Sequence, residues 1–247
     1  MKKIALVTGG GSGIGANVAI SLAKDGWDVV IAGRRKEVLD ELVAQNPSLR
    51  LFAIPADVSD EKSVIALMEE MLAKFGRLDL LFNNAGVGSP AVEIDELSLT
   101  EWNRVIGINV TGMFLCAREA FRIMRNQDPK GGRIINNGSV SAYAPRPNSI
   151  AYTTTKHAIT GMTKSIQLDG RPFDITASQI DIGNAATDLM KSASTGTKQA
   201  DGSIKQEPTI DVSEVGRAVT YMASLPLSAN VANMTLMATK MPFVGRG

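Results

Sequence analysis

Short β-branched runs alternate with longer stretches of helical periodicity along the chain, and this alternation constrains the fold more than any other feature. Parallel strands need a crossover connection between them, which a helix usually supplies. In one helical stretch a single apolar face is formed by Val64, Leu67, Met68, Met71, Leu72 and Phe75. The alternation therefore predicts an α/β fold, with about seven strands in a doubly wound parallel sheet and helices on both faces, in three layers.

The positions of these runs give the expected elements. Strands are predicted at residues 4–8, 28–32, 51–56, 78–83, 133–137, 175–182 and 233–238. Helices are predicted at residues 14–25, 36–45, 60–75, 100–125 and 152–168. Ser59 is the expected N-cap of the third helix. No linker or internal repeat interrupts the pattern, so the chain is interpreted as one domain spanning residues 1–247.

One stretch, TDLMKSASTGTKQADGSIKQEPTI at residues 187–210, breaks the alternation, because it is polar and without clear periodicity. A segment of this length inside an α/β domain is usually a functional lid or a mobile region. We expect a substrate loop or lid here, with a plain surface insertion as the alternative. Its polarity favours a polar or sugar-like substrate.

Charge and composition argue against several classes of function. Lys plus Arg is 26 and Asp plus Glu is 25, so the net charge of +1 gives no reason to expect nucleic acid or an anionic membrane as a partner. The single cysteine excludes an internal disulfide, and the single histidine argues against a zinc or iron site. We therefore expect a small-molecule substrate and no metal.

The first ten residues, MKKIALVTGG, contain an apolar run that is too short for a secretory signal. No later run approaches the ~18 apolar residues of a membrane span. Together with the single cysteine, which suits a reducing compartment, these features predict a cytoplasmic protein that is complete from residue 1.

The stretch VTGGGSGIG follows the first predicted strand and opens the first predicted helix. Gly9, Gly13 and Gly15 allow a tight turn and let backbone N–H groups approach a phosphate at the helix N-terminus. A strand before the glycines and a helix after them is the context that a dinucleotide-binding turn requires. A Rossmann-like site is the favoured interpretation, and a tight turn without a ligand is the alternative.

The second predicted strand ends without the acid that usually binds the ribose 2′-hydroxyl of NAD. Gly33 stands at that position and is followed by Arg34 and Arg35. Two guanidinium groups suit a 2′-phosphate, so NADP(H) is preferred and NAD(H) remains possible. The alternative is that both arginines form the solvated start of the next helix.

Several motifs in a fixed order resemble the short-chain dehydrogenase/reductase family, in its short single-domain branch, and the likeness covers nearly the whole chain. TGGGSGIG resembles the family's TGxxxGxG turn, and NNAG at residues 83–86 resembles the motif after its fourth strand. Tyr152 and Lys156 match YxxxK, and Ser139 lies thirteen residues before the tyrosine, which is the family's serine spacing. Asn109, in INVTG, stands where the family has its helix asparagine.

The resemblance implies an NAD(P)-dependent oxidoreductase and assigns roles to individual residues. The implied catalytic residues are Asn109, Ser139, Tyr152 and Lys156. The implied cofactor-binding residues are Gly9, Gly11, Ser12, Gly13, Ile14, Gly15, Arg34, Arg35, Asp57, Val58, Asn84, Ala85, Gly86, Tyr152, Lys156, Gly183 and Thr187. Substrate contacts are assigned to Ser139, Ser141 and Tyr152, and a homo-oligomer, either a tetramer or a dimer, is expected.

Three positions differ from the family pattern. Ile182 replaces the usual proline before Gly183, and Gly138 stands where a serine is common before the catalytic serine. Ser12 occupies a position where NADP-preferring relatives often carry a basic residue. The C-terminal sequence MATKMPFVGRG also departs from the family's usual ending.

The spacing of Tyr152 and Lys156 has its own chemical logic. The two residues lie one helical turn apart, so both side chains can reach one site. A cation beside a phenol favours its ionised form and eases proton exchange near neutral pH. Tyr152 would act as general acid toward a carbonyl oxygen, and as base in reverse, while Ser139 hydrogen-bonds that oxygen. By resemblance, Lys156 also holds the nicotinamide ribose and Asn109 anchors a water that relays protons.

The remaining candidates are weaker. Cys116 is expected in the core, and His157 in a structural or surface role. Ser141, Tyr143 and the turn at residues 145–147 are expected to border the substrate. Arg118, Arg122 and Arg125 are interpreted as a solvated helix face.

Two other functions compete with an alcohol–carbonyl oxidoreductase. A nucleotide-sugar epimerase or dehydratase also uses a Tyr-xxx-Lys pair, but its branch of the family has a different glycine spacing and a C-terminal substrate domain for which this chain has no room. A non-catalytic dinucleotide-binding redox sensor typically loses the tyrosine or the lysine, and this chain has both.

Overall fold

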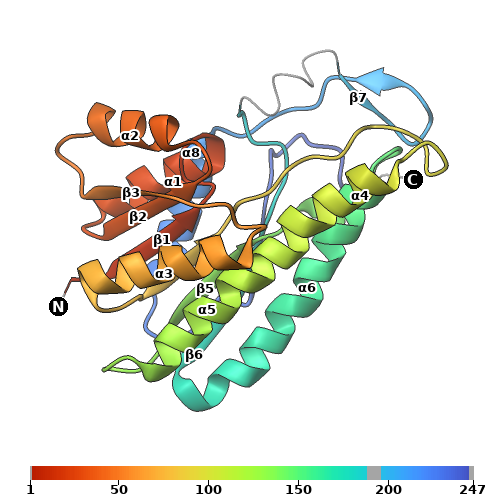
Figure 1. Cartoon of the computed structure of the whole chain (residues 1–247). Coiled ribbons are helices and arrows are strands. Elements are labelled where there is room, and N and C mark those ends of the chain that lie inside the picture. The colour runs from red at the N-terminus through yellow and green to blue at the C-terminus, as the bar shows by residue number, and fades with distance from the viewer. Residues whose placement is uncertain (1, 188–195, 245–247) are drawn as a thin grey trace.

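Seven parallel strands form one sheet in a computed structural model, which describes residues 2–187 and 196–244. The strands are β1 (Ile4–Thr8), β2 (Asp28–Gly33), β3 (Leu51–Pro55), β4 (Leu80–Asn83), β5 (Gly132–Asn137), β6 (Ile175–Ile182) and β9 (Asn233–Leu236). Their order is β3-β2-β1-β4-β5-β6-β9 (Figure 1). The chain starts in the middle of the sheet and winds outward in both directions, which confirms the predicted doubly wound topology. The reversal of strand order between β1 and β4 is where such sheets bind ligands.

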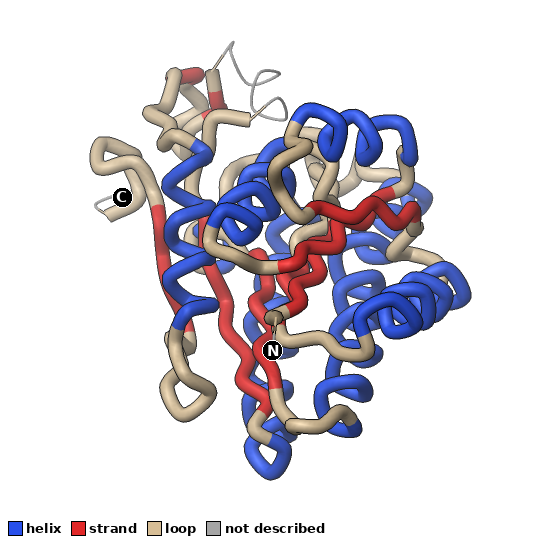
Figure 2. The backbone as a smooth tube through the Cα atoms, turned by 90° about the vertical axis from the view of Figure 1, so that its left-hand side faces the viewer, coloured by secondary structure: helices blue, strands red, loops and turns tan. Residues whose placement is uncertain are grey.

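Helices cover both faces of this sheet (Figures 1 and 2). One face packs against α1 (Gly13–Lys24), α2 (Lys36–Gln45) and α8 (Val212–Ser224). The other packs against α3 (Glu61–Phe75), α5 (Met113–Asn126) and α6 (Ile150–Gly170). The predicted three layers are therefore present.

A hydrophobic core lies on each face of the sheet, and alternate residues of the same strands contribute to the two cores. In β1, Ala5 and Val7 belong to the core beneath α1 and α8, whereas Leu6 belongs to the core beneath α3 and α5. All three side chains are fully buried. A strand that is apolar at every position can be buried on both faces, which is why these strands appear in the sequence as continuous hydrophobic runs.

The helices differ from the sequence-based expectation in three places. The cap of α3 is Asp60, whose carboxylate accepts the N–H groups of Lys62 and Ser63, so the prediction of Ser59 was wrong. The hydroxyl of Ser59 donates instead to Asp57 at 2.7 Å. The helix α8 was not expected, although Val215, Val219 and Met222 recur at helical spacing and are buried against α1.

The third difference lies in the long helix expected at residues 100–125. It consists of α4 (Leu99–Ile106), a π-helical segment (Gly107–Gly112) and α5. π-helical turns inside α-helices often occur at functional sites. This one carries Asn109, which is buried and faces the loop after β4.

The polar stretch at residues 187–210 contains a small hairpin that the sequence did not predict. Strand β7 (Thr197–Lys198) pairs antiparallel with β8 (Ile204–Lys205). After the hairpin, Ile210 forms a bridge with Ala185, which ties the segment back to the loop after β6. Residues 188–195 of the predicted lid lie outside the described residues.

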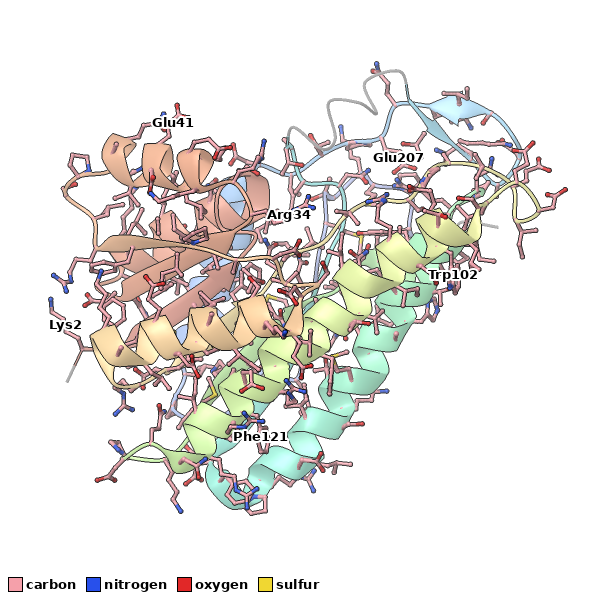
Figure 3. All side chains as sticks on the ribbon, in the orientation of Figure 1. Lys2, Arg34, Glu41, Trp102, Phe121 and Glu207 are labelled. Atoms are coloured by element: carbon pink, nitrogen blue, oxygen red, sulfur yellow. The ribbon has the colours of Figure 1, made fainter. Side chains whose placement is uncertain are left out.

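Figure 3 shows Arg34 and Glu207 toward the carboxyl ends of the strands, while Lys2 and Phe121 lie toward the other end.

Among the residues that the structure describes, no helix has the length and apolar character needed to cross a membrane.

Candidate active site

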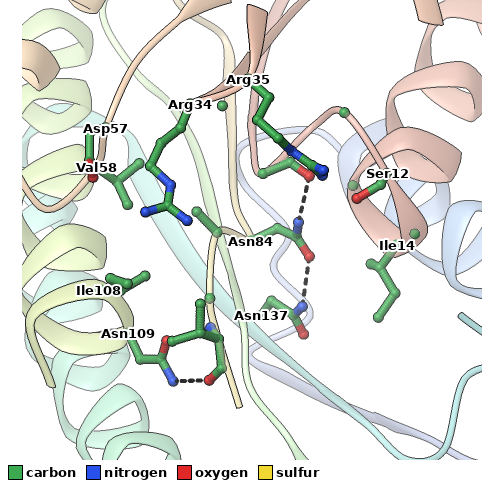
Figure 4. Close-up of a pocket in the computed structure, with 18 of the residues that line it drawn as sticks. Ser12, Ile14, Arg34, Arg35, Asp57, Val58, Asn84, Ile108, Asn109 and Asn137 are labelled. Atoms are coloured by element: carbon green, nitrogen blue, oxygen red, sulfur yellow. Dashed lines mark hydrogen bonds between the residues drawn. The ribbon is translucent and has the colours of Figure 1, made fainter. Parts of the chain in front are cut away.

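A pocket opens at the carboxyl ends of the central strands, next to the point where the strand order reverses. It is lined by residues of the glycine turn, of the loops after β2, β3 and β4, of the π-helical segment and of α6 (Figure 4). Segments up to about 180 residues apart in the chain therefore meet at one cavity, whose two ends carry different chemistry.

The glycine turn forms one wall of the pocket through its backbone. Gly9 and Gly13 have φ of 63° and 53°, in the left-handed region that favours glycine. A Cβ atom on Gly15 would lie 2.1 Å from the carbonyl oxygen of Gly9, so no larger residue fits there without moving the backbone. The turn leaves the N-terminus of α1 open to the pocket, which is the geometry that binds a phosphate.

A hydrogen-bond network joins the ends of β1, β4 and β5 beneath this turn. The Thr8 hydroxyl accepts the N–H groups of Asn84 at 2.9 Å and Ala85 at 3.0 Å. The side chain of Asn84 donates to the Thr8 carbonyl at 3.0 Å and accepts from Asn137 at 2.8 Å. The amide groups of the NNAG motif thus hold the three strand ends in register, and the motif's backbone faces the pocket.

The end of the pocket near β2 and β3 is positively charged. Arg34 and Arg35 are exposed and line it, and neither forms a salt bridge with any residue of the described part of the chain. In Figure 4 the Arg34 side chain points into the pocket between Val58 and Asn84. These guanidinium groups are therefore available to an anionic ligand.

Asp57 lies beside this charge, near the start of the loop after β3. Burial raises its pKa, but the hydrogen bonds from the Ser59 hydroxyl and amide and the charge of Arg34 outweigh burial, and the net pKa is lowered. Both Ser59 bonds go to Oδ1, at 2.7 and 2.9 Å. Asp57 is therefore an ionised hydrogen-bond acceptor at the rim of the pocket.

Tyr152 and Lys156 line the opposite end of the pocket from the first turns of α6. Lys156 is 7% exposed, and its ammonium group donates to the Asn137 carbonyl at 2.8 Å. The same ammonium lies 5.4 Å from the centroid of the Tyr152 ring. The hydrogen bond to the end of β5 thus holds the cation beside the phenol, as the one-turn spacing predicts.

Asn109 connects this end of the pocket to the loop after β4. Its side-chain oxygen accepts the Val87 N–H at 2.8 Å, and its amide donates to the Val87 carbonyl at 2.9 Å. The amide also reaches the Thr155 hydroxyl at 3.3 Å, and Thr155 donates to the Tyr152 carbonyl at 2.7 Å. Asn109 therefore fixes the loop against α6. The predicted water relay stays a prediction.

Ser139 caps a short 3₁₀ turn (Val140–Ala142), and only Gly138 separates it from the end of β5. The Ser139 hydroxyl oxygen accepts the N–H of Ser141 at 3.1 Å, so its own hydrogen remains free to donate. At the other end of the turn, the Tyr143 hydroxyl donates to Asp181 at 3.0 Å. Burial and the neighbouring Asp181 raise the pKa of Tyr143, so this phenol stays protonated.

Most of the predicted cofactor residues meet in this pocket. All of them line it except Gly183, which packs against Met237 and Met241. Asn109, Tyr152 and Lys156 line the pocket too. Ser139 and Ser141 are not among its lining residues, although they follow the lining residue Asn137 closely along the chain. Gly33, noted in the sequence as the position without an acid, also lines the pocket, and the lining residues that the sequence did not single out are Val38, Leu39, Ala56, Val87, Ile108 and Asn137.

Asp181 is the principal site residue that sequence reasoning missed. It is fully buried near the end of β6 and accepts the backbone N–H of Ser139 at 2.8 Å. The signal was present, because an acid inside the otherwise apolar run IDI is unexpected in a buried strand. The glycine at position 138, where the resemblance implies serine, was a second signal.

The weaker candidates lie outside the pocket. Cys116 is fully buried, and burial raises the pKa of its thiol to about 12, which confirms the prediction of a core residue. His157 is exposed and bonds the Thr153 carbonyl at 2.9 Å, as expected of a surface role. Arg118 and Arg122 both form salt bridges with the buried Glu119, and Arg118 also pairs with Glu61. Within residues 2–187 and 196–244, no group of three His, Cys, Asp or Glu residues could hold a metal ion.

The pocket fits a dinucleotide. Its glycine cradle leaves no room for a Cβ at Gly15, and its charged end holds two guanidinium groups that form no salt bridge in the described chain. The Tyr152–Lys156 pair closes the other end. The glycine turn, a positively charged end and the Tyr152–Lys156 pair therefore share one cavity.

Comparisons with known proteins agree with this geometry. The profile described as short chain dehydrogenase matches residues 3–198. The chain is 37% identical over 199 residues to the 3beta-hydroxysteroid dehydrogenase of Mediterraneibacter gnavus, covering 80% of this chain and 71% of that protein. It is 34% identical over 220 residues to glucose 1-dehydrogenase 2 of Bacillus subtilis, covering 87% and 83% of the two chains.

A solved structure is similar over almost the whole length. The 3-ketoacyl-(acyl-carrier-protein) reductase of Brucella melitensis, complexed with NADH, superposes with a TM-score of 0.86 at 27% identity. The match covers 96% of this chain and 98% of that one. The sheet order, the glycine turn, the Tyr152–Lys156 pair and these relatives lead to one conclusion: the chain belongs to the short chain dehydrogenase family of oxidoreductases.

Proposed function

We propose that this protein interconverts an alcohol and a carbonyl compound with NADP(H) as its preferred cofactor, and that Tyr152 exchanges the proton. The observation that carries the proposal is the position of the Lys156 ammonium, 5.4 Å from the Tyr152 ring centroid and hydrogen-bonded to Asn137, in the same pocket as the glycine turn. A plain surface pair would not explain why Lys156 is buried beside a half-buried Tyr152 at the end of this pocket.

We assign each residue a task in the proposed reaction. Tyr152 donates its phenolic proton to the carbonyl oxygen during reduction and takes it back during oxidation. Lys156 stabilises the phenolate that remains, because a neighbouring cation favours the ionised form. Ser139 donates its free hydroxyl hydrogen to the same oxygen as charge develops there. When bound, the nicotinamide supplies or accepts the hydride.

The preference for NADP(H) rests on the charged end of the pocket. Arg34 and Arg35 offer guanidinium groups to a 2′-phosphate, and Gly33 offers no carboxylate to a ribose hydroxyl. Asp57 and Val58 line the pocket between this end and the π-helical segment, where they would contact the adenine. We propose that the N-terminus of α1 and the amides of Gly11–Ile14 hold the pyrophosphate.

The substrate is proposed only as a class. Relatives are named for a 3β-hydroxysteroid, for glucose and for a 3-ketoacyl thioester, and any of these chemistries presents a secondary alcohol, a lactol or a ketone. The polar hairpin at residues 197–205 favours the polar members of this group. A homo-oligomer and a cytoplasmic location stay predictions, which analytical ultracentrifugation and cell fractionation test.

The test is a turnover assay with a matched variant. Purified protein is mixed with NADPH or NADH and a 3-ketosteroid or acetoacetyl-CoA, or with NADP⁺ or NAD⁺ and glucose, and absorbance at 340 nm is followed. We expect turnover with at least one pair, faster with the phosphorylated cofactor, and a loss of about 10²-fold or more in Tyr152→Phe. Binding of NADPH, measured by fluorescence titration, should stay within about twofold in that variant.

Two results would count against the proposal. Full turnover in Tyr152→Phe would remove the assigned proton donor. Tight NADPH binding without turnover of any carbonyl compound or alcohol in a broad panel would favour the redox-sensing alternative.

A further inference from the structure

Asp181 is a buried carboxylate that the proposed reaction does not use directly. It is the next-to-last residue of β6 and has no measurable exposure. Its Oδ1 accepts the Ser139 N–H at 2.8 Å and the Gln179 side-chain amide at 2.7 Å. Its Oδ2 accepts the Tyr143 hydroxyl at 3.0 Å and the Asn233 side-chain amide at 2.7 Å.

These four bonds satisfy the carboxylate without a cation. A buried charge is costly unless it is hydrogen-bonded or paired, and here four neutral donors perform that task. No salt bridge to Asp181 exists among the described residues. Two donors, Gln179 and Asn233, come from β6 and β9, and the other two come from the two ends of the Ser139–Tyr143 turn. The carboxylate therefore spans the turn that presents the Ser139 hydroxyl.

The residue before Ser139, Gly138, is matched to the position of the Asp181 carboxylate. A Cβ atom at position 138 would lie 2.0 Å from Oδ1 of Asp181, and 2.9 Å from the Gln179 side chain. Gly138 is not among the glycines with positive φ, so space rather than backbone conformation requires glycine here. The acid at 181 takes the space that a side chain before Ser139 would need, which accounts for the departure at Gly138 from the family pattern.

We infer that Asp181 is a positioning residue for the active site, which fixes the backbone of Ser139 and the ring of Tyr143 through one carboxylate. The inference rests on the proposed function, because the place of the Ser139 hydroxyl matters only if that hydroxyl contacts the substrate oxygen. With its hydroxyl bonded to Asp181, Tyr143 lies edge-to-face with Phe243 at a centroid distance of 6.5 Å. Asp181 thus also links the turn to the C-terminal segment.

The first test measures the turn itself. Hydrogen–deuterium exchange is followed by mass spectrometry in Asp181→Asn and in the unaltered protein. We expect exchange in the peptide covering residues 138–143 to become at least about tenfold faster, since an amide cannot accept all four donors. Exchange in the peptide covering the glycine turn, residues 9–15, should not change. Unchanged exchange at 138–143 would overturn the inference.

The second test is a double-mutant cycle between Gly138 and Asp181, read from thermal and urea unfolding. Gly138→Ala should lower Tm clearly when Asp181 is present and much less in Asp181→Ala, because the clash with Oδ1 is then absent. Gly161→Ala, in α6 with nothing within 4 Å of the added carbon, is the matched control. Equal Tm losses for Gly138→Ala in both backgrounds would contradict the pairing.

The third test separates positioning from general stability. Asp181→Asn should reduce kcat by about 10- to 100-fold with the best compound of the panel, while the Kd for NADPH stays within about twofold. Asp28→Asn is the matched control, because Asp28 is also a buried strand carboxylate, paired with Arg50 at the other end of the sheet. That variant should lower Tm and leave kcat unchanged.

The outcomes of these tests are distinct. A kcat for Asp181→Asn equal to that of the unaltered protein, or an equal loss of kcat and NADPH affinity, would overturn the positioning role. Absence of any turnover in the unaltered protein would instead count against the proposed function. The exchange and unfolding experiments would then still decide whether Asp181 holds the Ser139 turn.

Discussion

The proposed cofactor side of the site is built from backbone, whereas the proposed substrate side is held by the buried carboxylate of Asp181. On the cofactor side, Gly9, Gly13 and Gly15 make a cradle by leaving out their Cβ atoms. On the substrate side, Asp181 holds Ser139 and Tyr143 through side-chain hydrogen bonds. The first construction is local in sequence and the second joins residues about 40 positions apart.

This difference determines how substitutions should disrupt each side of the site. A backbone cradle fails by steric overlap, because the atoms that would have to move are themselves main chain. A polar network fails when one partner is removed and the others are left buried without hydrogen bonds. Changes on the cofactor side should therefore abolish binding, whereas changes on the substrate side should leave binding intact and loosen the turn or the hairpin.

The largest effect is expected at Gly15. In Gly15→Ala the new carbon would lie 2.1 Å from the Gly9 carbonyl oxygen and 2.8 Å from the Asn84 side chain. Over-packing of this kind costs about 1–3 kcal/mol or more, and here it also closes the phosphate cradle. We expect NADPH binding to become undetectable by fluorescence titration and Tm to fall.

Gly11→Ala is the control within the same turn. Its added carbon would meet only the flexible side chains of Leu39 and Val38, both at 3.2 Å. NADPH affinity should fall much less in this variant. Similar losses for Gly11→Ala and Gly15→Ala would break the backbone account of the cradle.

A smaller effect is expected from the two arginines. Arg34→Ala and Arg35→Ala each remove a guanidinium that has no salt bridge in the described chain. A hydrogen bond to a charged group contributes about 1.5–3 kcal/mol, so the Kd for NADPH should rise roughly 10- to 100-fold in the more important of the two variants. The Kd for NADH should change little. Equal losses for the two cofactors would remove the assignment to the 2′-phosphate.

On the substrate side, Glu207 ties the hairpin to the rest of the molecule. Its side chain is 3% exposed, forms a salt bridge with Arg146, and accepts from Asn184 at 2.8 Å and Gln199 at 3.0 Å. Glu207→Gln should speed proteolytic cleavage in the hairpin several-fold, because one partner of a buried network is weakened. The Kd for NADPH should not change.

Two controls show that this opening is local. Glu214→Gln, which alters the exposed salt bridge to Arg217 on α8, should leave cleavage unchanged. The buried Cys116 thiol, whose pKa is raised to about 12, should resist alkylation near pH 8 in both variants. Faster alkylation of Cys116 in Glu207→Gln would mean that the whole fold, and not the hairpin, had loosened.

The smallest effect is the pH dependence contributed by Asp57. Its pKa in the folded protein lies below the usual aspartate value of 3.8. A carboxyl group whose pKa is lowered by folding stabilises the folded protein at pH values above its pKa in the unfolded chain. This stabilisation is lost as the pH falls through the pKa of the group in the folded protein. The stability gap between the unaltered protein and Asp57→Asn should therefore shrink between neutral pH and about pH 3, as measured by urea unfolding. A gap that widened on acidification would contradict the lowered pKa.

The contrast between local features and features that join distant residues also explains which predictions from the sequence were correct. The ranges 4–8, 36–45 and 175–182 coincide with β1, α2 and β6, because β-branched runs and helical periodicity are local signals. The glycine turn and the one-turn spacing of Tyr152 and Lys156 are local too. The pocket accordingly contains nearly all of the cofactor residues expected from the sequence.

Features that depend on distant partners were missed. Nothing near Asp181 in the sequence shows that its carboxylate meets Ser139 and Asn233, and nothing near Glu207 shows its salt bridge to Arg146. The cap of α3 was placed one residue early because Ser59 and Asp60 are both good caps, and the bond from Ser59 to Asp57 decides between them. The helix α8 was overlooked although its apolar spacing was present.

The measurement that tests the central claim most directly follows a deuterium label. NADPH carrying deuterium at both C4 positions is incubated with the protein and the best carbonyl substrate, and the alcohol is analysed by mass spectrometry. The account predicts an alcohol one mass unit heavier, formed by the unaltered protein and reduced about 10²-fold or more in a Tyr152→Phe variant that binds NADPH equally well. An unlabelled alcohol, or a labelled one formed at the same rate by Tyr152→Phe, would contradict it.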